Sequence, residues 1–294
     1  MTNSEPSAEG APQPVSVAIP AHNAADTIDE QLAALSRQSY GGRVEVVVVD
    51  DHSTDGTRAV ADAWKDRLPG LRTIATTDGR GAAHAYNTGV ASSTNDIVCL
   101  CDADDIVDDH WLERLVGALD HADFATGGIV TWTGGPLPVD PHPDVMGTAG
   151  FGFLPIVSTG NLGFTKTAWS KVGGFNEALP TCEDVEFSWR AQTHGLKLAV
   201  ERDAFIYYRV PASPRNTVRK SIEYGRYQPV LYRDYRRLGM PRQPVHRALA
   251  RWAKLLVTSY QLFGSESERR AWSAEFGKRL GRLIGSVEAR SLFL

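Results

Sequence analysis

The first hundred residues alternate short apolar runs with stretches of helical spacing. Residues 15–20 (VSVAIP) and 44–49 (VEVVVV) have the length of strands and are too apolar for a sheet with one face in water. Between them, Ile28, Leu32 and Leu35 recur at the spacing of one helix face. A second helical stretch follows the second run. The pattern predicts an α/β protein with a doubly wound sheet, whose ligands bind beyond the carboxyl ends of the strands.

Acidic residues stand where these elements end. Asp102 and Asp104 follow the apolar run 96–101 (DIVCLC), and alternation along a strand points their carboxylates the same way. Such a pair holds Mg²⁺ or Mn²⁺, which in turn holds a diphosphate, although Asp-x-Asp also occurs in ordinary acidic turns. Glu183 and Asp184 open a later helix, where acids also simply interact with the helix dipole. Together with the acidic pair after the second run, these clusters favour a ligand site.

Six stretches of the chain carry a family resemblance. In order and spacing they resemble the family-2 glycosyltransferases, which have the GT-A fold. The stretches are VSVAIPAHN (15–23), EVVVVDDHSTDGT (45–57), GRGAAHAYNTG (79–89), DIVCLCDADD (96–105), STGNLGFTKTAWSKVGGFNE (158–177) and CEDVEFSWR (182–190). The resemblance covers residues 14–210. It implies a doubly wound, mixed and mostly parallel sheet, with a nucleotide-sugar part at 14–105 and an acceptor part at 106–210.

The resemblance implies a donor site at the strand ends. Its nucleotide-sugar-binding residues are Pro20, His22, Asn23, Asp51, Arg80, Asn87 and Asp102. Asp51 is expected to accept the N3–H of a uracil ring and His22 to stack on that ring, so the expected donor is a UDP-sugar. Asp104, together with Asp102, is expected to bind Mg²⁺ or Mn²⁺. Asp105 is expected to cap the helix that follows.

Asp184 is the catalytic base that the resemblance implies. A base on the face opposite the departing diphosphate implies inversion at the anomeric carbon. An unperturbed Asp has a pKa of about 3.9 and a helix N-terminus favours its ionised form, so we expect a weak base. Glu183 and Asn161 are expected to bind the acceptor, which is a sugar, a lipid-linked molecule or a small molecule.

The sequence departs from many metal-dependent relatives after the last strand of the catalytic part. Those relatives have a His there as a further metal ligand, whereas residues 207–210 are YYRV. Arg209, or Arg215 and Arg219 in the next helix, are alternative groups for neutralising the diphosphate directly. The sequence therefore leaves open whether a metal is required.

Composition fits one catalytic domain with an appendage, since the chain has 294 residues of which 42% are hydrophobic. Residues 1–13 are rich in Ser, Glu, Gly and Pro, which predicts a disordered tail and no signal peptide. No run reaches the roughly 18 apolar residues of a membrane span. Three cysteines do not make a disulfide framework, so we expect a cytoplasmic protein.

Charge is divided unevenly along the chain. Its net charge is −4, but residues 209–294 hold 18 Lys and Arg against 6 Asp and Glu, whereas the preceding residues hold 13 against 29. Residues 211–294 are predicted to form a basic extension of amphipathic helices. Two explanations stay open: packing against the acidic catalytic part, or peripheral contact with the inner face of the plasma membrane. No nucleic-acid partner is expected.

Three other functions are alternatives to glycosyl transfer. A sugar-nucleotide pyrophosphorylase needs a Gly-rich basic loop after the first strand, whereas residues 20–23 are PAHN. A nicotinamide dehydrogenase needs Gly-x-Gly-x-x-Gly at the same place, which the sequence lacks. A non-catalytic nucleotide-sugar-binding or scaffold protein has no need of Asp184. Turnover of a donor distinguishes this last alternative from an enzyme.

Overall fold

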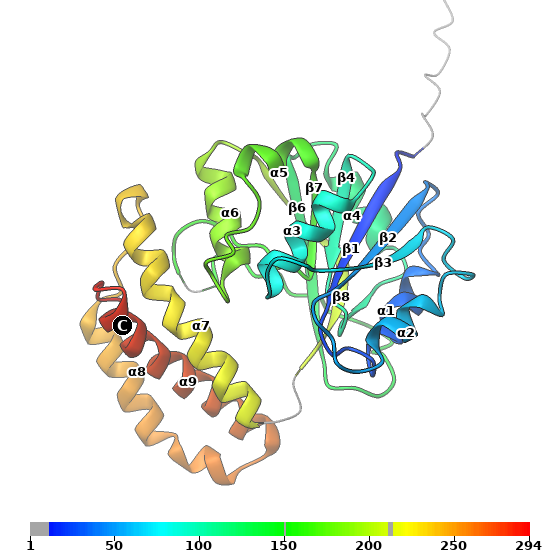
Figure 1. The fold of residues 1–294 in the computed structure, drawn as a ribbon. Coiled ribbons are helices and arrows are strands. Elements are labelled where there is room, and N and C mark those ends of the chain that lie inside the picture. The colour runs from blue at the N-terminus through cyan, green and yellow to red at the C-terminus, as the bar shows by residue number, and fades with distance from the viewer. Residues whose placement is uncertain (1–11, 150, 211–213) are drawn as a thin grey trace, which may run out of the picture.

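The computed structural model describes residues 12–149, 151–210 and 214–294, without the side chains of residues 214 and 215. Its centre is an eight-stranded mixed sheet of order β3-β2-β1-β4-β7-β6-β8-β5 (Figure 1). The strands are β1 (Val15–Ala21), β2 (Val44–Asp50), β3 (Leu71–Ala75), β4 (Ile97–Cys101), β5 (Ile106–Val107), β6 (Phe124–Trp132), β7 (Asn161–Thr165) and β8 (Leu198–Arg209). The first four pair in parallel, and β7 joins β4 antiparallel. The predicted doubly wound, mixed sheet is confirmed.

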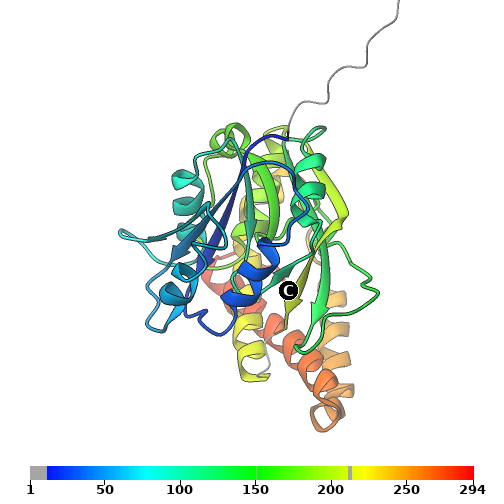
Figure 2. The same cartoon turned by 90° about the vertical axis from the view of Figure 1, so that its right-hand side faces the viewer.

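Helices cover both faces of the sheet, as Figure 2 shows from the side. Those of the α/β part are α1 (Ile28–Leu35), α2 (Thr57–Asp62), α3 (Ala82–Ser92), α4 (Trp111–Ala118), α5 (Lys166–Val172) and α6 (Glu183–Thr193). Val17 and Ile19 of β1 pack with α1 and α4 in one core, whereas Ala18 packs with α3, α5 and α6 in the other. The two-sided burial explains why the first strands are continuously apolar.

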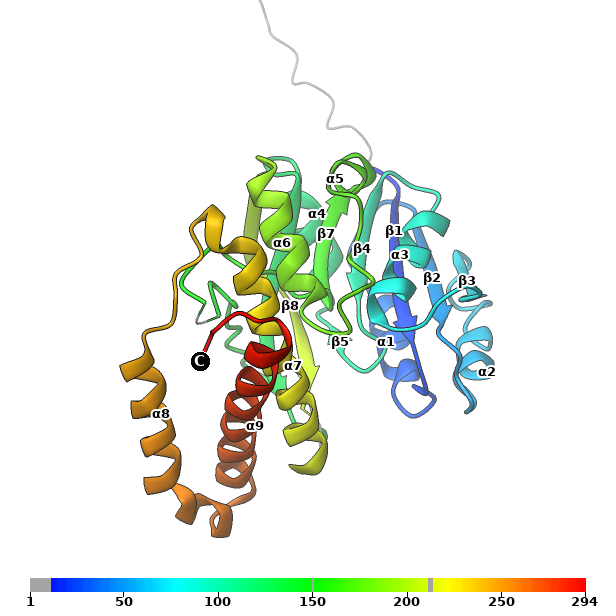
Figure 3. The ribbon, with the colours of Figure 1, turned by 60° about the vertical axis from the view of Figure 1, so that its left-hand side comes forward.

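The remaining chain forms helices beside the α/β part (Figure 3). They are α7 (Pro214–Tyr235), η1 (Arg236–Leu238), α8 (Val245–Val257), η2 (Ser259–Phe263) and α9 (Glu266–Glu288). The backbones of α7 and α9 approach closely. A Cβ atom at Gly281 would lie 2.1 Å from the Ile222 carbonyl oxygen, and one at Gly285 would lie 1.9 Å from the Arg226 carbonyl oxygen. Only glycine fits such a contact.

The C-terminal part of α7 is tied to α6. Leu231 and Tyr235 are buried against Val185 and Trp189 of α6. Part of the basic extension therefore packs against the α/β part. Among the described residues, no helix is both long and apolar enough to cross a membrane.

Candidate active site

A cavity of about 500 Å³ opens at the carboxyl ends of β1, β2 and β4. It lies where a doubly wound sheet places its ligands. Predicted donor-site residues line it together: Pro20, His22, Asn23, Asp51, Asp102 and Asp104. Tyr86, Arg209 and Lys220 also line it. One cavity thus gathers residues from the ends of β1, β2, β4 and β8, from α3 and from α7.

Asp51 is held by a ring of donors just beyond β2. One carboxylate oxygen is 3.0 Å from both His52 Nδ1 and Thr76 Oγ1, and the other accepts the Gly81 N–H at 2.9 Å. Burial acts to raise the pKa of Asp51, but these hydrogen bonds outweigh it and lower the pKa. Asp51 is therefore a fixed anion. A carboxylate has about four acceptor positions, so a position remains for a ligand N–H.

The imidazole of His22 is fixed by hydrogen bonds on both nitrogens. Its Nδ1 lies 2.6 Å from the Asp51 carbonyl oxygen, which only accepts, so we assign the proton to Nδ1. The Asn23 amide then donates to Nε2 at 3.2 Å. Asn23 itself has φ of 50° and accepts the Thr54 N–H at 2.8 Å, which ties it to the β2–α2 loop. The ring is thereby held at the cavity wall.

Three carboxylates converge after β4. Ligand atoms of Asp102, Asp104 and Asp105 all lie within 4.8 Å of one another. Asp105 is 1% exposed; one of its oxygens accepts the Arg209 N–H at 2.9 Å, whereas its buried Oδ2 has no hydrogen-bond partner. Burial, followed by the charges of Asp102 and Asp104, raises the pKa of Asp105 well above its usual value. An orphaned buried oxygen among three acids fits a divalent cation.

The prediction that Asp105 caps the following helix is wrong. Asp105 lies just before β5, and α4 begins only at Trp111. The N-cap position of α4 is His110, which makes no side-chain cap hydrogen bond. Space beside Asp102 also depends on Gly160, since a Cβ atom there would lie 2.7 Å from Asp102 Oδ2. We call residues 102–105, which carry the three carboxylates, the acidic turn. A residue larger than Gly at position 160 would fill the space beside Asp102.

Buried polar side chains fix the acidic turn. The Tyr86 hydroxyl donates to the Asp102 carboxylate. Gln31 donates to the Asp102 carbonyl at 3.1 Å and accepts the Val107 N–H at 3.0 Å. Arg209 donates from Nε to the Asp104 carbonyl at 2.9 Å. Tyr86 and Gln31 were not predicted as supports, although Gln31 lies three residues after Ile28 and four before Leu35, on the predicted inner face of its helix.

Asp184 and Glu183 begin α6, after Cys182 with φ of 65°. Burial raises the pKa of Asp184 to about 6, and burial followed by the Asp184 charge raises that of Glu183 to about 8. Desolvation outweighs the helix N-terminus, so the predicted weak base with an ordinary Asp pKa is wrong, whereas Asp184 is still mostly ionised at neutral pH as predicted. The Asp184 carboxylate also contributes to the raised pKa of Asp102, after burial and Asp104. Asp184 therefore interacts electrostatically with Asp102, which lines the cavity.

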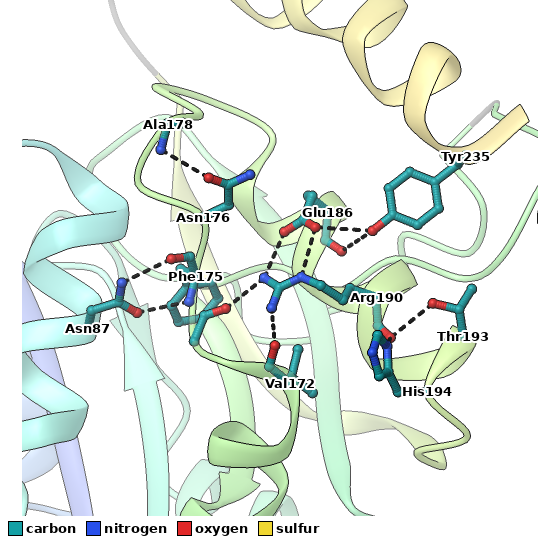
Figure 4. A network of polar contacts seen from close by, with 11 residues as sticks. Asn87, Val172, Phe175, Asn176, Ala178, Glu186, Arg190, Thr193, His194 and Tyr235 are labelled. Atoms are coloured by element: carbon teal, nitrogen blue, oxygen red, sulfur yellow. Dashed lines mark hydrogen bonds and ion pairs between the residues drawn. The ribbon is translucent and has the colours of Figure 1, made fainter.

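A polar network holds α6 in place (Figure 4). Arg190 donates to both Glu186 carboxylate oxygens at 2.8 Å and to the Gly174 carbonyl at 2.7 Å. The Tyr235 hydroxyl of α7 donates to Glu186 Oε1 at 3.1 Å. The network fixes the helix that carries Asp184 to both the α5–α6 loop and α7.

Two predicted site residues, Asn87 and Asn161, make structural hydrogen bonds outside the cavity. Figure 4 shows Asn87 facing Phe175: its amide donates to the Phe175 carbonyl at 3.0 Å and accepts the Phe175 N–H at 2.8 Å. Asn161 is fully buried, donates to the Ala204 carbonyl at 2.8 Å and accepts the Trp111 indole N–H at 2.8 Å. Asn87 therefore holds the α5–α6 loop and Asn161 joins strands, which corrects the donor and acceptor contacts expected of them.

Of the basic alternatives to a metal, Arg209 lines the cavity and Arg219 does not. The Arg209 guanidinium pairs with Glu30 and lies 4.4 Å from the centre of the Trp132 ring. Arg80 is exposed and does not line the cavity. The side chain of Arg215 lies outside the described residues. Lys220 was not predicted, because its helix lies beyond the resembling stretches.

Comparisons with known proteins agree with this geometry. Glycosyltransferase AglE of Haloferax volcanii is 29% identical over 222 residues, which are 73% of this chain and 72% of that protein. Several further curated relatives are matched over less than two thirds of their own length.

Solved structures share the fold. A mannosyltransferase of Pyrobaculum calidifontis in complex with GDP-Man and Mn²⁺ has a TM-score of 0.63 and 22% identity, covering 94% of this chain and 86% of that one. TarS of S. aureus in complex with UDP has a TM-score of 0.55 and 18% identity, covering 94% and 92%. These likenesses confirm the predicted GT-A fold.

A family model settles the membership. The model described as Glycosyl transferase family 2 matches residues 16–171, more than half of the chain. Together with the sheet and its strand-end cavity, this match confirms the predicted resemblance and the prediction of an enzyme. The chain therefore belongs to glycosyl transferase family 2.

Proposed function

We propose that this glycosyltransferase moves a sugar from a UDP-sugar to an acceptor hydroxyl with inversion at the anomeric carbon. The observation that carries the proposal is the cavity itself, which joins a fixed anion and a fixed ring, Asp51 and His22, to the acidic turn at Asp102 and Asp104. The complexes of structural neighbours with UDP, UDP-GlcNAc or GDP-Man support a nucleotide-sugar donor.

The nucleobase is assigned to the end of the cavity near β2. Asp51 retains an acceptor position for the uracil N3–H, and His22 offers a ring held by two hydrogen bonds. A ring fixed before the ligand arrives loses little conformational entropy on binding. The proposal therefore places the base between these residues and the sugar toward the acidic turn.

The acidic turn is proposed to hold Mg²⁺ or Mn²⁺ through Asp102 and Asp104, with Asp105 as a further candidate ligand. The orphaned Asp105 oxygen and the three close carboxylates fit such an ion. When bound, a divalent cation neutralises charge on a diphosphate. Lys220 lines the same cavity and its charge lowers the Asp102 pKa against the effect of burial, so we propose that it faces the diphosphate as well.

Asp184 is proposed as the general base. Its raised pKa of about 6 makes it a stronger base than an ordinary Asp, while most of it is still ionised at neutral pH. The acceptor oxygen forms a bond to the anomeric carbon as the bond from that carbon to the diphosphate oxygen breaks. The diphosphate leaves with the electron pair, and the acceptor proton goes to the Asp184 carboxylate. Glu183 is proposed to contact the acceptor.

A peripheral contact with an anionic membrane surface is proposed for the C-terminal helices, with a lipid-linked or cell-surface acceptor. Large apolar side chains are exposed on α8 and η2, including Leu249 at 64%, Leu256 at 76% and Phe263 at 92%. They belong to the part of the chain with 18 basic against 6 acidic residues. Apolar side chains beside excess positive charge suit a surface that is both negative and apolar.

The donor proposal is tested by turnover. The purified protein is incubated with UDP-, GDP- and dTDP-sugars and a divalent cation, and free nucleotide diphosphate is measured with and without candidate acceptors. We expect release from UDP-sugars. Tight UDP binding without release from any donor would favour the non-catalytic alternative, whereas preference for GDP- or dTDP-sugars would change only the donor.

Membrane contact has a separate test. Sedimentation with anionic and neutral vesicles is compared across a salt series for the wild type and for Leu256→Ser/Phe263→Ser. We expect salt-sensitive binding to anionic vesicles that weakens in the variant. Equal, salt-insensitive binding to both vesicles would remove the membrane part and leave the transferase proposal intact.

A further inference from the structure

A second cavity lies between α8 and α9, outside the site described above. Its volume is about 470 Å³. Five basic side chains line it, Arg251, Lys254, Lys278, Arg279 and Arg282, and Glu275 is the acidic residue among the described residues of its wall. Figure 3 shows the two helices that form it running side by side, away from β1–β4. We name this the basic cavity.

The basic cavity contains buried guanidinium groups whose donors are incompletely used. Arg279 is 5% exposed and Arg282 is 6% exposed. Arg279 donates from Nη2 to Glu275, but its Nε and Nη1 have no partner. Arg282 donates from Nε to Gln228 at 2.5 Å, while its Nη1 has no partner. Buried donors of this kind are normally satisfied, so their presence here indicates a missing acceptor.

The cations also repel one another. Burial first, and then the charges of Arg279 and Arg251, lower the pKa of Arg282 to about 10. Burial likewise lowers the pKa of Lys278, and nearby arginines add to the shift. One carboxylate, that of Glu275, faces five positive groups. An anion with more than one negative charge would relieve the repulsion and accept the free N–H groups.

Phosphoryl groups match this arrangement best among common anions. They carry more charge than a carboxylate and present several acceptor oxygens, and the planar fork of Arg binds them through paired hydrogen bonds. The wall also includes Leu255 and the indole of Trp272, which stacks on Phe276 at 5.3 Å between ring centres. The cavity thus offers an apolar wall for an organic part attached to the phosphoryl group.

We propose that the basic cavity is a second ligand site that binds a phosphoryl or diphosphoryl group. The same chemistry is available from an anionic lipid headgroup and from a soluble phosphate compound. The proposed site does not depend on the donor proposal, because it shares no lining residue with the cavity at the ends of β1, β2 and β4, which we call the nucleotide cavity.

The test measures binding of inorganic diphosphate by titration calorimetry in EDTA, which removes divalent ions from the acidic turn. The double variant Arg251→Gln/Lys254→Gln changes two side chains that are less buried than Arg279 and Arg282, so the fold is expected to survive. We expect affinity to fall at least about tenfold, as two charge-assisted interactions are lost. The matched control, Arg242→Gln/Arg247→Gln, removes equal charge from exposed positions outside the cavity and should keep the affinity within about twofold.

Two further arms identify the source and guard against the nucleotide cavity. Lys220→Gln removes a cation that lines the cavity at the ends of β1, β2 and β4, so any diphosphate bound there should bind more weakly, whereas the binding that Arg251→Gln/Lys254→Gln weakens should remain. Sedimentation with phosphatidylcholine vesicles containing phosphatidic acid, lost in Arg251→Gln/Lys254→Gln but kept in the control variant, identifies a lipid headgroup. Diphosphate binding without such sedimentation identifies a soluble ligand. The proposal is overturned if neither probe binds, if both double variants bind alike, or if Lys220→Gln alone abolishes binding.

Discussion

Asp51 is the aspartate proposed to bind the nucleobase and Asp184 the one proposed to accept a proton, and their surroundings push their pKa values in opposite directions. Around Asp51, hydrogen bonds from His52, Gly81 and Thr76 overcome burial and lower the pKa. Around Asp184, burial dominates and raises the pKa to about 6, although the backbone N–H of Val185 lies 2.7 Å away. The contrast separates a fixed anion suited to binding from a carboxylate suited to accepting a proton.

The supporting structure follows the same division. The proposed nucleotide end is built on β1, β2 and β4, where residues at the strand ends line the cavity. The proposed acceptor end is carried by α6, whose own Arg190 donates to the Gly174 carbonyl in the α5–α6 loop and whose Glu186 accepts from Tyr235 of α7. Changes at one end should therefore alter binding, and changes at the other should alter rate.

The largest effect is expected from Asp184→Asn. The amide cannot accept the acceptor proton, so transfer should slow by about 10²-fold or more, the usual contribution of a positioned base. Affinity for UDP should stay as in the wild type, because Asp184 does not line the nucleotide cavity. Rates and UDP affinity are measured on the same preparations, with Glu266→Gln in the exposed first turn of α9 as a control. Wild-type transfer by Asp184→Asn would remove Asp184 from the role of base.

Asp51→Asn should weaken UDP binding more than it slows transfer. Loss of a charge-assisted hydrogen bond to the base is expected to weaken UDP binding by about tenfold to 10²-fold. The rate at saturating donor should change less. Asp62→Asn on α2, which breaks an ion pair with Lys65 outside the cavity, is the matched control. Unchanged UDP affinity in Asp51→Asn would contradict the assignment of the nucleobase to this end.

A smaller, graded effect is expected from pH. Asp184 acts as a base only when ionised, and its raised pKa of about 6 means that protonation begins not far below neutral pH. The rate at saturating donor should therefore fall with decreasing pH, by about tenfold per pH unit once below 6. The residual rate of Asp184→Asn should lack this limb. A limb at the same pH in the variant would assign it to another group.

The nucleotide end was largely predictable from the sequence. Apolar runs that end at Pro20, Val49 and Cys101 predict the ends of β1, β2 and β4 to within one residue, and parallel strands bring those ends together. Tertiary contacts explain why Asn87 and Asn161 do not make the donor and acceptor contacts predicted for them. Asn87 faces the α5–α6 loop, and Asn161 is turned into the sheet interior, as their hydrogen bonds demand.

The chemistry of the acceptor end was less predictable, because it depends on burial. A sequence places Asp184 at a helix N-terminus, but desolvation by the surrounding fold decides its pKa. The predicted helix-cap role of Asp105 was wrong because β5 lies between Asp105 and α4, so the Asp105 carboxylate stays in the acidic turn. Lys220 reaches the cavity from α7, a helix without family resemblance.

The cavity at the ends of β1, β2 and β4 is proposed to bind UDP with the help of the acidic turn. Titration calorimetry of UDP, with and without Mn²⁺, for the wild type and Asp104→Asn tests this proposal most directly. We expect tighter UDP binding with Mn²⁺ in the wild type, no such gain in Asp104→Asn, and weaker binding of GDP and dTDP. Binding of UDP that ignores both Mn²⁺ and Asp104, or much tighter binding of GDP or dTDP, would contradict it.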